Sequence, residues 1–342
     1  MVKQKYEKAL SFIIVSFPID KFAPRKNCGS MKRSMLISLL LTGCVCVGVG
    51  YAKWATLRRI AYAAIPGVLQ ERQEGVTFPS GNLSLSGTLY MPGWSLRKRP
   101  AVVICHGGTP IGRRMAMYVI MARELAARGY VVLTFDFRGF GESDDPKRFE
   151  TFSDLDFTHD ISAAVNYVSQ LRQVDTSRLF LIGHSFGAGV VLPASIREQR
   201  VRKTISLSPP RNTAGRQYGP NAADPSYPQR RLSQDMNIHP PIPKEVFYPH
   251  LKEYVAEEIL RYPEHRPVFF IDGSEEDKNE QDFLRTVYEQ MTEPKAYTTI
   301  QGADHYFGTQ RGQDGSSGSV PYEAIIMQNL IDVIDQWFRK DD

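Results

Sequence analysis

Cysteine is scarce in this chain of 342 residues. Only four are present, and three of them, Cys28, Cys44 and Cys46, belong to the first 46 residues. A single cysteine in the rest of the chain can form neither an internal disulfide framework nor a cysteine-based zinc site. This remaining residue, Cys105, ends an apolar run, so we expect a buried thiol.

Clustered positive charge is missing from most of the chain. Residues 1–72 hold 12 Lys and Arg against 3 Asp and Glu, whereas residues 73–342 hold 30 against 34. The net charge of +5 therefore belongs to the N-terminal segment. The larger part has no basic helix and no interleaving of basic with aromatic residues, so we expect no binding of nucleic acid.

One stretch lacks charge altogether. Residues 34–52 are 19 uncharged residues rich in Leu and Val, flanked by Lys32, Arg33 and Lys53. A helix of that length spans the hydrocarbon core of a bilayer, so we predict a transmembrane signal-anchor. Two alternatives stay open: a cleaved signal peptide, and a lipoprotein signal in which Leu-Thr-Gly-Cys ends at a lipidated Cys44.

The flanking charges predict the orientation of this stretch. Five Lys and Arg precede it and four follow it within about 20 residues, which favours a translocated C-terminal part. Met31 opens the sequence Met-Lys-Arg-Ser, which is typical of a signal start, so either Met1 or Met31 begins the protein. We expect residues 1–72 to contain the anchor and a linker, and residues 73–342 to form a membrane-anchored, extracytoplasmic domain.

Short apolar runs alternate with amphipathic stretches in residues 73–342. The runs predict buried strands at 101–105, 131–137, 179–182, 201–207, 268–271 and 296–300, after a hairpin at 76–91. The amphipathic stretches predict helices at 114–128, 157–171, 280–291 and 320–339; Asp154, Asp156 and Asp160 lie near the start of the second, where the helix dipole favours them. This order predicts an α/β fold with a mostly parallel sheet covered on both faces.

Residues 209–263 interrupt the pattern. They hold 10 of the 22 prolines and few periodic apolar residues. We predict a cap over the strand ends, spanning about residues 209–265. An irregular surface loop is the alternative.

Residues 183–187 read Gly-His-Ser-Phe-Gly and directly follow the strand predicted at 179–182. G-x-S-x-G at the end of a strand is the sequence form of a nucleophile elbow. Glycine is needed on both sides because neighbouring backbones approach too closely for a Cβ atom, and the turn strains the serine. Ser185 is therefore the predicted nucleophile.

A serine nucleophile needs a base, an orienting acid and donors for an oxyanion. His-Gly-Gly follows the strand at 101–105, so we assign the oxyanion hole to the backbone N–H groups of Gly108 and Phe186. Among the seven histidines, only His305 follows the final predicted strand within a turn, and it is the predicted base.

The acid should lie between serine and histidine, after the strand at 268–271. Residues 272–277 read Asp-Gly-Ser-Glu-Glu-Asp and hold four carboxylates. Asp272 sits at the strand end before the glycine turn and ranks last. The predicted acid is Glu276 or Asp277.

Residues from about 76 to 340 resemble an α/β-hydrolase. Besides the two glycine motifs, residues 136–143, Asp-Phe-Arg-Gly-Phe-Gly-Glu-Ser, are similar to the family's D-x-R-G-x-G-x-S segment. The resemblance implies an eight-stranded sheet and a lid in residues 209–263. Family members commonly place the acid, usually Asp, three residues after the strand-end glycine. That position is Glu276 here, so Asp277 stays an alternative.

These residues predict a serine hydrolase that cleaves a carboxylic ester of a small-molecule acyl substrate through an acyl-enzyme. The mechanism implies no metal and no organic cofactor. A serine peptidase or amidase of the same superfamily is one alternative. A non-catalytic, membrane-tethered binding protein on this scaffold is another, from a different functional class.

Overall fold

A computed structural model describes residues 71–93, 97–109, 111–147, 152–211, 254–309 and 324–340. The predicted anchor at 34–52, with Cys44, and most of the predicted cap lie outside these residues. Within the described ranges, no helix has both the length and the apolar character needed to cross a membrane.

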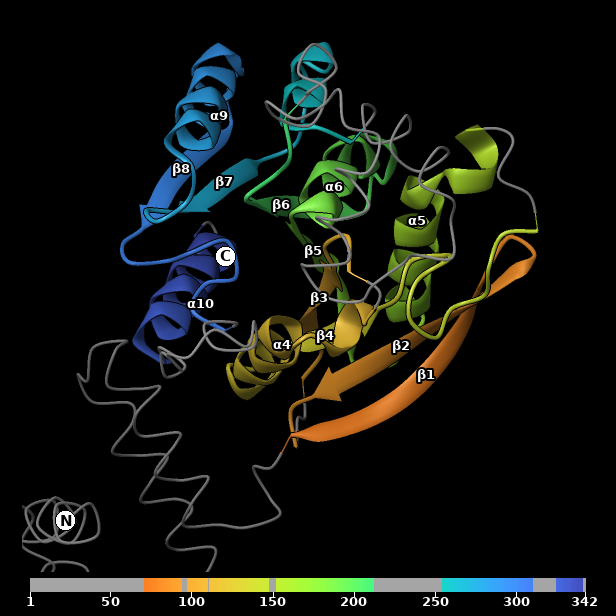
Figure 1. Cartoon of the computed structure of the whole chain (residues 1–342). Coiled ribbons are helices and arrows are strands. Elements are labelled where there is room, and N and C mark those ends of the chain that lie inside the picture. Colours follow the sequence, from red (N-terminus) through yellow and green to blue (C-terminus); the bar gives the residue numbers. More distant parts are fainter. Residues whose placement is uncertain are drawn as a thin grey trace, which may run out of the picture. The chain divides into compact units, whose positions relative to one another are not determined.

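An eight-stranded sheet carries the fold (Figure 1). β2 runs antiparallel to its neighbours β1 and β4, and every pairing from β4 to β8 is parallel. The spatial order is β1-β2-β4-β3-β5-β6-β7-β8, which confirms the predicted α/β-hydrolase fold. The strands are β1 (Arg72–Ser80), β2 (Leu83–Met91), β3 (Arg99–Cys105), β4 (Val131–Phe135), β5 (Val174–His184), β6 (Val201–Leu207), β7 (Val268–Gly273) and β8 (Lys295–Ile300).

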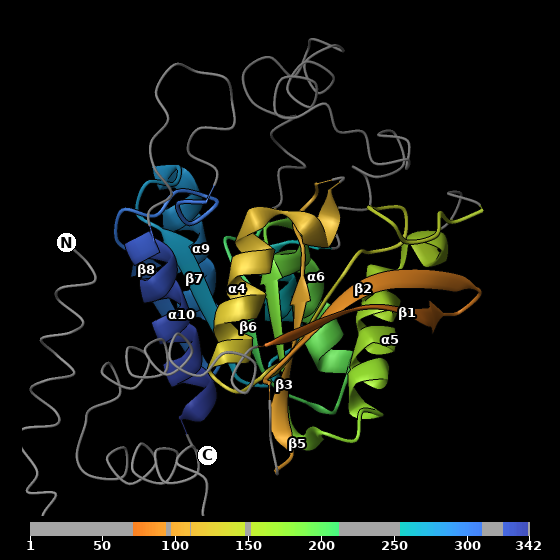
Figure 2. The same ribbon diagram turned by 90° about the horizontal axis from the view of Figure 1, so that it is seen from below.

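Helices cover both faces of the sheet (Figures 1 and 2). α4 (Ala116–Ala127) and α10 (Ala324–Arg339) pack on one face, and α5 (Phe157–Ser169) and α6 (Phe186–Arg197) on the other. α9 (Lys278–Gln290) packs against β7 on the α6 side. Short 3₁₀ turns span Gly112–Arg114, Phe152–Leu155 and Ala256–Arg261.

The continuous apolar runs follow from this two-sided burial. In β3, Val103 and Cys105 face α5 and α6, whereas Val102 and Ile104 face α4 and α10. Side chains alternate along a strand, so a strand covered on both faces is apolar throughout. The predicted burial of the Cys105 thiol is confirmed, and burial raises its pKa well above the usual value.

Residues 136–142, which follow β4, hold the loop after β3 in place. The Asp136 carboxylate has no exposed surface; it accepts the backbone N–H groups of Arg113 (2.7 Å) and Glu142 (2.9 Å) and pairs with the Arg113 guanidinium. The N–H of Phe137 donates to His106 Nε2 at 3.1 Å. These contacts fix the loop after β3, which carries the predicted oxyanion donor.

A buried ion pair joins the same segment to α5. Arg138 and Asp160 are 5% and 0% exposed, and Arg138 Nη2 lies 2.7 Å from Asp160 Oδ1, which also accepts the Ser80 hydroxyl at 2.7 Å. The sequence suggested a helix-dipole role for Asp160. Asp160 does lie in the first turn of α5, and its carboxylate also compensates Arg138; Asp156 caps α5 by accepting the N–H of Thr158.

The substitution Asp160→Ala would leave the Arg138 guanidinium buried without its counter-charge. Breaking a buried pair from one side costs about 3–5 kcal/mol. We expect the free energy of unfolding, measured by urea denaturation and circular dichroism, to fall by that amount. Asp175→Ala is the control, because Asp175 pairs with Arg178 at the surface and such pairs contribute at most about 1 kcal/mol. Equal losses in both variants would contradict this account.

Candidate active site

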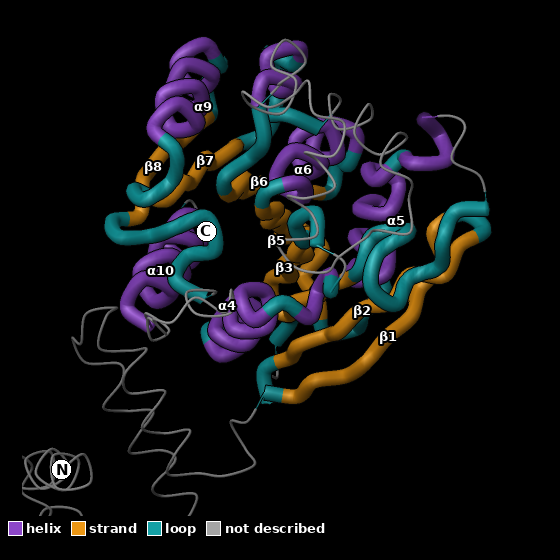
Figure 3. The backbone as a smooth tube through the Cα atoms, in the orientation of Figure 1, coloured by secondary structure: helices purple, strands orange, loops and turns teal. Residues whose placement is uncertain are grey.

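The predicted site residues all lie at the carboxyl ends of neighbouring parallel strands. The elbow follows β5, the His-Gly-Gly loop follows β3, the acidic turn follows β7, and the loop of His305 follows β8. In a parallel sheet these ends share one edge, and this edge is where open α/β sheets bind ligands. Figure 3 shows these loops in teal around the ends of β5 and β7.

The elbow has the strained geometry that the motif predicts. Ser185 has φ 53° and ψ −119°, and its N–H donates to the Leu207 carbonyl at 2.9 Å. A Cβ at Gly183 would lie 2.2 Å from the Gly187 carbonyl oxygen, and one at Gly187 would lie 2.4 Å from the Cys105 carbonyl oxygen. Only glycine fits either position, and the close approach presses the elbow against the loop after β3.

That loop lies directly beside Ser185. A Cβ at Gly107 would be 3.2 Å from the Ser185 Cβ, and one at Gly108 would be 3.7 Å from the Phe186 Cβ. Phe186 is the first residue of α6, and its side chain is only 4% exposed. The two residues predicted to supply the oxyanion donors, Gly108 and Phe186, therefore meet next to Ser185.

Glu276 is the carboxylate that faces His305. Its Oε2 lies 3.5 Å from His305 Nδ1, at the outer limit for a hydrogen bond, and its side chain is 9% exposed. Its other oxygen, Oε1, accepts the Ser208 hydroxyl and the Gly273 N–H (3.2 Å). Burial raises the pKa of Glu276, but the contacts with His305, Ser208 and Gly273 outweigh burial and lower it. The side chain is thus suited to accept a hydrogen bond as an anion.

The other carboxylates of this turn point elsewhere. Asp277 is exposed and caps α9, where its side chain accepts the Asn279 N–H at 2.8 Å. The Asp272 carboxylate accepts the hydroxyl of Tyr297 at 2.6 Å. Of the two predicted acids, the geometry therefore brings Glu276 and not Asp277 to His305.

Ser208 is a site residue that the sequence reasoning missed. It is the first residue after β6, has φ 49°, and its hydroxyl donates to Glu276 from 68 residues away in the chain. The only available signal was its position at the carboxyl end of a buried strand, beside the elbow strand. Such a position marks a candidate, but it does not show which way a side chain points.

Two hydrogen bonds join the acidic turn at residues 272–277 to the loop of His305. The N–H of Glu275 donates to the Ala303 carbonyl at 2.9 Å, and the N–H of Gly302 donates to the Ser274 hydroxyl at 2.8 Å. The side chain of His305 itself is 39% exposed. Among the described contacts its ring hydrogen-bonds to Glu276 and not to the Ser185 hydroxyl.

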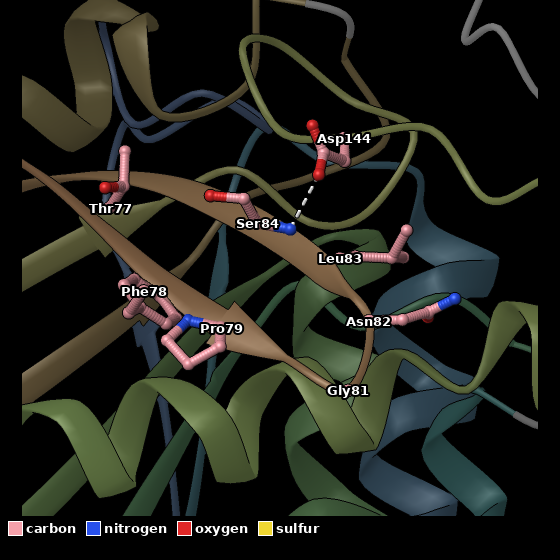
Figure 4. A pocket seen from close by; sticks show the side chains of 8 residues that line it. All are labelled: Thr77, Phe78, Pro79, Gly81, Asn82, Leu83, Ser84 and Asp144. Atoms are coloured by element: carbon pink, nitrogen blue, oxygen red, sulfur yellow. Dashed lines mark hydrogen bonds between the residues drawn. The ribbon is translucent and has the colours of Figure 1, made fainter.

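One hollow lies away from the elbow. A hollow of about 340 Å³ opens at the β1–β2 hairpin (Figure 4), where the N–H of Ser84 donates to Asp144 Oδ2 at 2.7 Å. None of the predicted site residues lines it. No group of three or more His, Cys, Asp or Glu side chains in the described ranges is arranged to hold a metal ion.

The chain is similar in sequence to several known proteins. Residues 97–234 match the family described as serine aminopeptidase, S33. The chain is 35% identical to the quorum-quenching protein AidA of Acinetobacter baumannii over 138 residues, 39% of this chain and 43% of AidA. It is 27% identical to an uncharacterized protein of Mycobacterium tuberculosis over 284 residues, 81% of this chain and 90% of that protein. For AidA and three other curated relatives, the match spans only 37% to 44% of the relative's length.

Solved structures share the fold at low identity. A hypothetical protein of Pseudomonas aeruginosa, PA2218, superposes with a TM-score of 0.54 and 21% identity over 79% of this chain and 95% of its own. Est1E of Butyrivibrio proteoclasticus, solved with ferulic acid bound, has a TM-score of 0.54 and 18% identity over 78% of this chain and 98% of its own. Together with the strand order and the strained elbow, these likenesses show that the chain has the α/β-hydrolase fold.

Proposed function

We propose that this protein is a serine hydrolase that cleaves a carboxylic ester of a small acyl substrate. One observation supports the proposal most directly: the largely buried carboxylate of Glu276 lies 3.5 Å from Nδ1 of His305, at the same edge of the sheet as a strained elbow serine, Ser185. The three residues occur along the sequence in the order nucleophile, acid, base, which is the order found in α/β-hydrolases.

In the proposed mechanism, Ser185 attacks the ester carbonyl while His305 Nε2 takes the proton from its hydroxyl. Glu276 accepts the Nδ1–H of His305, which fixes the tautomer and stabilises the imidazolium. The N–H groups of Gly108 and Phe186 stabilise the oxyanion. His305 then protonates the leaving alcohol, and water, deprotonated by the same histidine, releases the acid from Ser185.

The lowered pKa of Glu276 supports this role, because an acid that orients histidine must be ionised at neutral pH. The long contact between His305 and Glu276 is compatible with it as well, since catalytic hydrogen bonds tighten in the complex with substrate. An ester is favoured over an amide by solved esterases of the same fold, including one from Pyrococcus furiosus with a TM-score of 0.53. The peptidase alternative keeps one specific support, the match to the serine aminopeptidase family.

Replacing the nucleophile tests the reaction class. We expect the wild-type protein to react with a fluorophosphonate probe and to hydrolyse p-nitrophenyl acyl esters. In Ser185→Ala labelling should vanish, and hydrolysis should fall by at least about 10³-fold, because the residual rate of such sites comes only from binding and the oxyanion hole.

Three results would redirect the assignment. Persistent labelling of a folded Ser185→Ala variant would place the nucleophile elsewhere. Cleavage of aminoacyl p-nitroanilides without cleavage of the matching esters would favour the peptidase. A folded wild-type protein that neither reacts with the probe nor turns over either substrate class would favour a binding protein.

The neighbouring acids provide a matched pair of variants. We expect Glu276→Gln to lower kcat by roughly 10³- to 10⁴-fold, because the amide cannot fix the histidine tautomer or stabilise its cation. Asp277→Asn makes the same chemical change one residue later and should leave kcat near the wild-type value, since Asn also caps helices well. The measurement is steady-state ester hydrolysis, and the reverse ranking would make Asp277 the acid.

We also propose that residues 34–52 anchor this domain at a membrane, with the domain on the extracytoplasmic side. The support is the uncharged length of the stretch and its basic flanks. We expect the full chain in the membrane fraction after carbonate washing. The double variant Leu40→Arg/Val47→Arg should be released, because each Arg costs about 2.5–3.5 kcal/mol at the centre of a span.

Mass spectrometry of the N-terminus separates the alternatives for this segment. A lipidated Cys44, lost in Cys44→Ser, would show a lipoprotein. An N-terminus beyond the apolar stretch would show a cleaved signal peptide. Recovery of the intact wild-type chain in the soluble fraction would overturn the anchor.

A further inference from the structure

Two buried polar side chains outside the proposed triad form a chain of hydrogen bonds beside it. Tyr118 in α4 has no exposed surface, and His184, which precedes Ser185, is 1% exposed. The Tyr118 hydroxyl lies 2.8 Å from His184 Nδ1 and accepts the N–H of Gly107 at 2.7 Å. At the far side of the ring, His184 Nε2 lies 2.7 Å from the carbonyl oxygen of His305. This chain of hydrogen bonds therefore runs from the loop after β3, which carries Gly107 and Gly108 (the oxyanion loop), to the loop after β8, which carries His305 (the base loop).

The chemistry of these groups fixes the direction of donation. A carbonyl oxygen only accepts, so His184 Nε2 carries a proton and donates it to His305. The neutral ring then accepts at Nδ1, where Tyr118 donates its hydroxyl proton, and the Tyr118 oxygen accepts from Gly107. Burial, with the His305 ring nearby, lowers the pKa of His184 to about 3, so the neutral form persists at neutral pH.

The sheet alone does not bring these two loops together. The oxyanion loop follows β3 and the base loop follows β8, and β5, β6 and β7 lie between them. Adjacent strands are about 4.8 Å apart, so four spacings amount to about 19 Å. The ring of His184 helps to close this gap, since its centroid lies 4.9 Å from that of the His305 ring.

We infer that Tyr118 and His184 are positioning residues, which hold the oxyanion donors and the base in register on the two sides of Ser185. The inference rests on the proposed function, because it assigns the pair a task in that reaction. Neither side chain acts on the reacting atoms; Tyr118 reaches the oxyanion loop through the N–H of Gly107, and His184 reaches the base through the backbone carbonyl of His305. A displacement of about 1 Å between reacting groups can cost about 10²-fold in rate, so coupling the two loops is a direct way to protect kcat.

Removal of one hydroxyl tests the inference against a matched control. Tyr118→Phe deletes the donor to His184 and the acceptor for Gly107. Tyr130→Phe deletes an equally buried hydroxyl, 1% exposed, which donates to Asp335 at 2.8 Å on α10. Tyr118→Phe loses two buried hydrogen bonds between neutral groups, and Tyr130→Phe loses one to a carboxylate, which is about twice as strong, so the two variants should show similar losses in thermal stability. Only Tyr118→Phe should lower kcat and the rate constant of fluorophosphonate labelling, by about 10- to 100-fold, with KM for a p-nitrophenyl ester little changed.

Two substitutions of His184 test the other end of the chain. The side-chain amide of His184→Gln can still donate to the His305 carbonyl, whereas His184→Leu cannot. We expect the glutamine variant to retain more of kcat than the leucine variant at similar thermal stability. Long-range ¹H–¹⁵N spectra should report a neutral His184 protonated at Nε2 in the wild type, independently of any activity.

The outcomes separate this inference from the proposed function. If the wild-type protein reacts with the probe and folded Tyr118→Phe reacts at the same rate, the positioning role is overturned and the proposed hydrolase function stands. Equal effects of Tyr118→Phe and Tyr130→Phe on kcat would do the same, since they would show a general loss of packing. A His184 protonated at Nδ1 would overturn the direction of the chain, and a wild-type protein without labelling or turnover would overturn the proposed function and this inference with it.

Discussion

The close approach of two backbones beneath the elbow is the constraint on which the site depends. At Gly187, the first turn of α6 is pressed so tightly against the end of β3 that a Cβ would lie 2.4 Å from the Cys105 carbonyl oxygen. This contact requires β3 and β5 to be neighbours, and they are, with Cys105 opposite Gly183. It also brings Gly107 to Ser185 and Gly108 to Phe186, so that the proposed nucleophile and the proposed oxyanion donors, from separate parts of the chain, meet at one place.

The sequence predicted the parts of the molecule whose signals are local. β6 has the predicted bounds, Val201–Leu207, although only Val201, Ile205 and Leu207 among its seven residues are apolar. β5 begins at Val174, five residues before the predicted start, because its first half is polar and partly exposed and gives no hydrophobic signal. The elbow was recognisable because the turn demands glycine at fixed positions, whatever the rest of the chain does.

The contacts of the site were not predictable to the same depth, because they depend on where side chains point. Glu276 and Asp277 are adjacent and chemically alike, but α9 begins at Lys278, so Asp277 becomes its cap and Glu276 turns toward His305. Ser208 meets Glu276 across 68 residues of sequence, a distance over which no periodicity carries information. The predicted anchor at 34–52 stays a prediction, since it lies outside the described residues.

Backbone strain gathers in the same loops. Among the described residues, three that are not glycine have positive φ angles: Ser185 (53°), Ser208 (49°) and Phe307 (49°). Ser185 lies in the elbow, and Ser208 lies directly after β6, where its hydroxyl donates to the proposed acid. Phe307 lies two residues after the proposed base. Each such conformation costs on the order of 1–3 kcal/mol and persists only where surrounding contacts determine it. The N–H groups of both serines donate to the next strand at 2.9 and 2.8 Å, and Phe307 is fully buried. Contacts with the core of the sheet thus stabilise the strained conformations in all three loops, so that the proposed nucleophile, acid and base are held in place before any substrate binds.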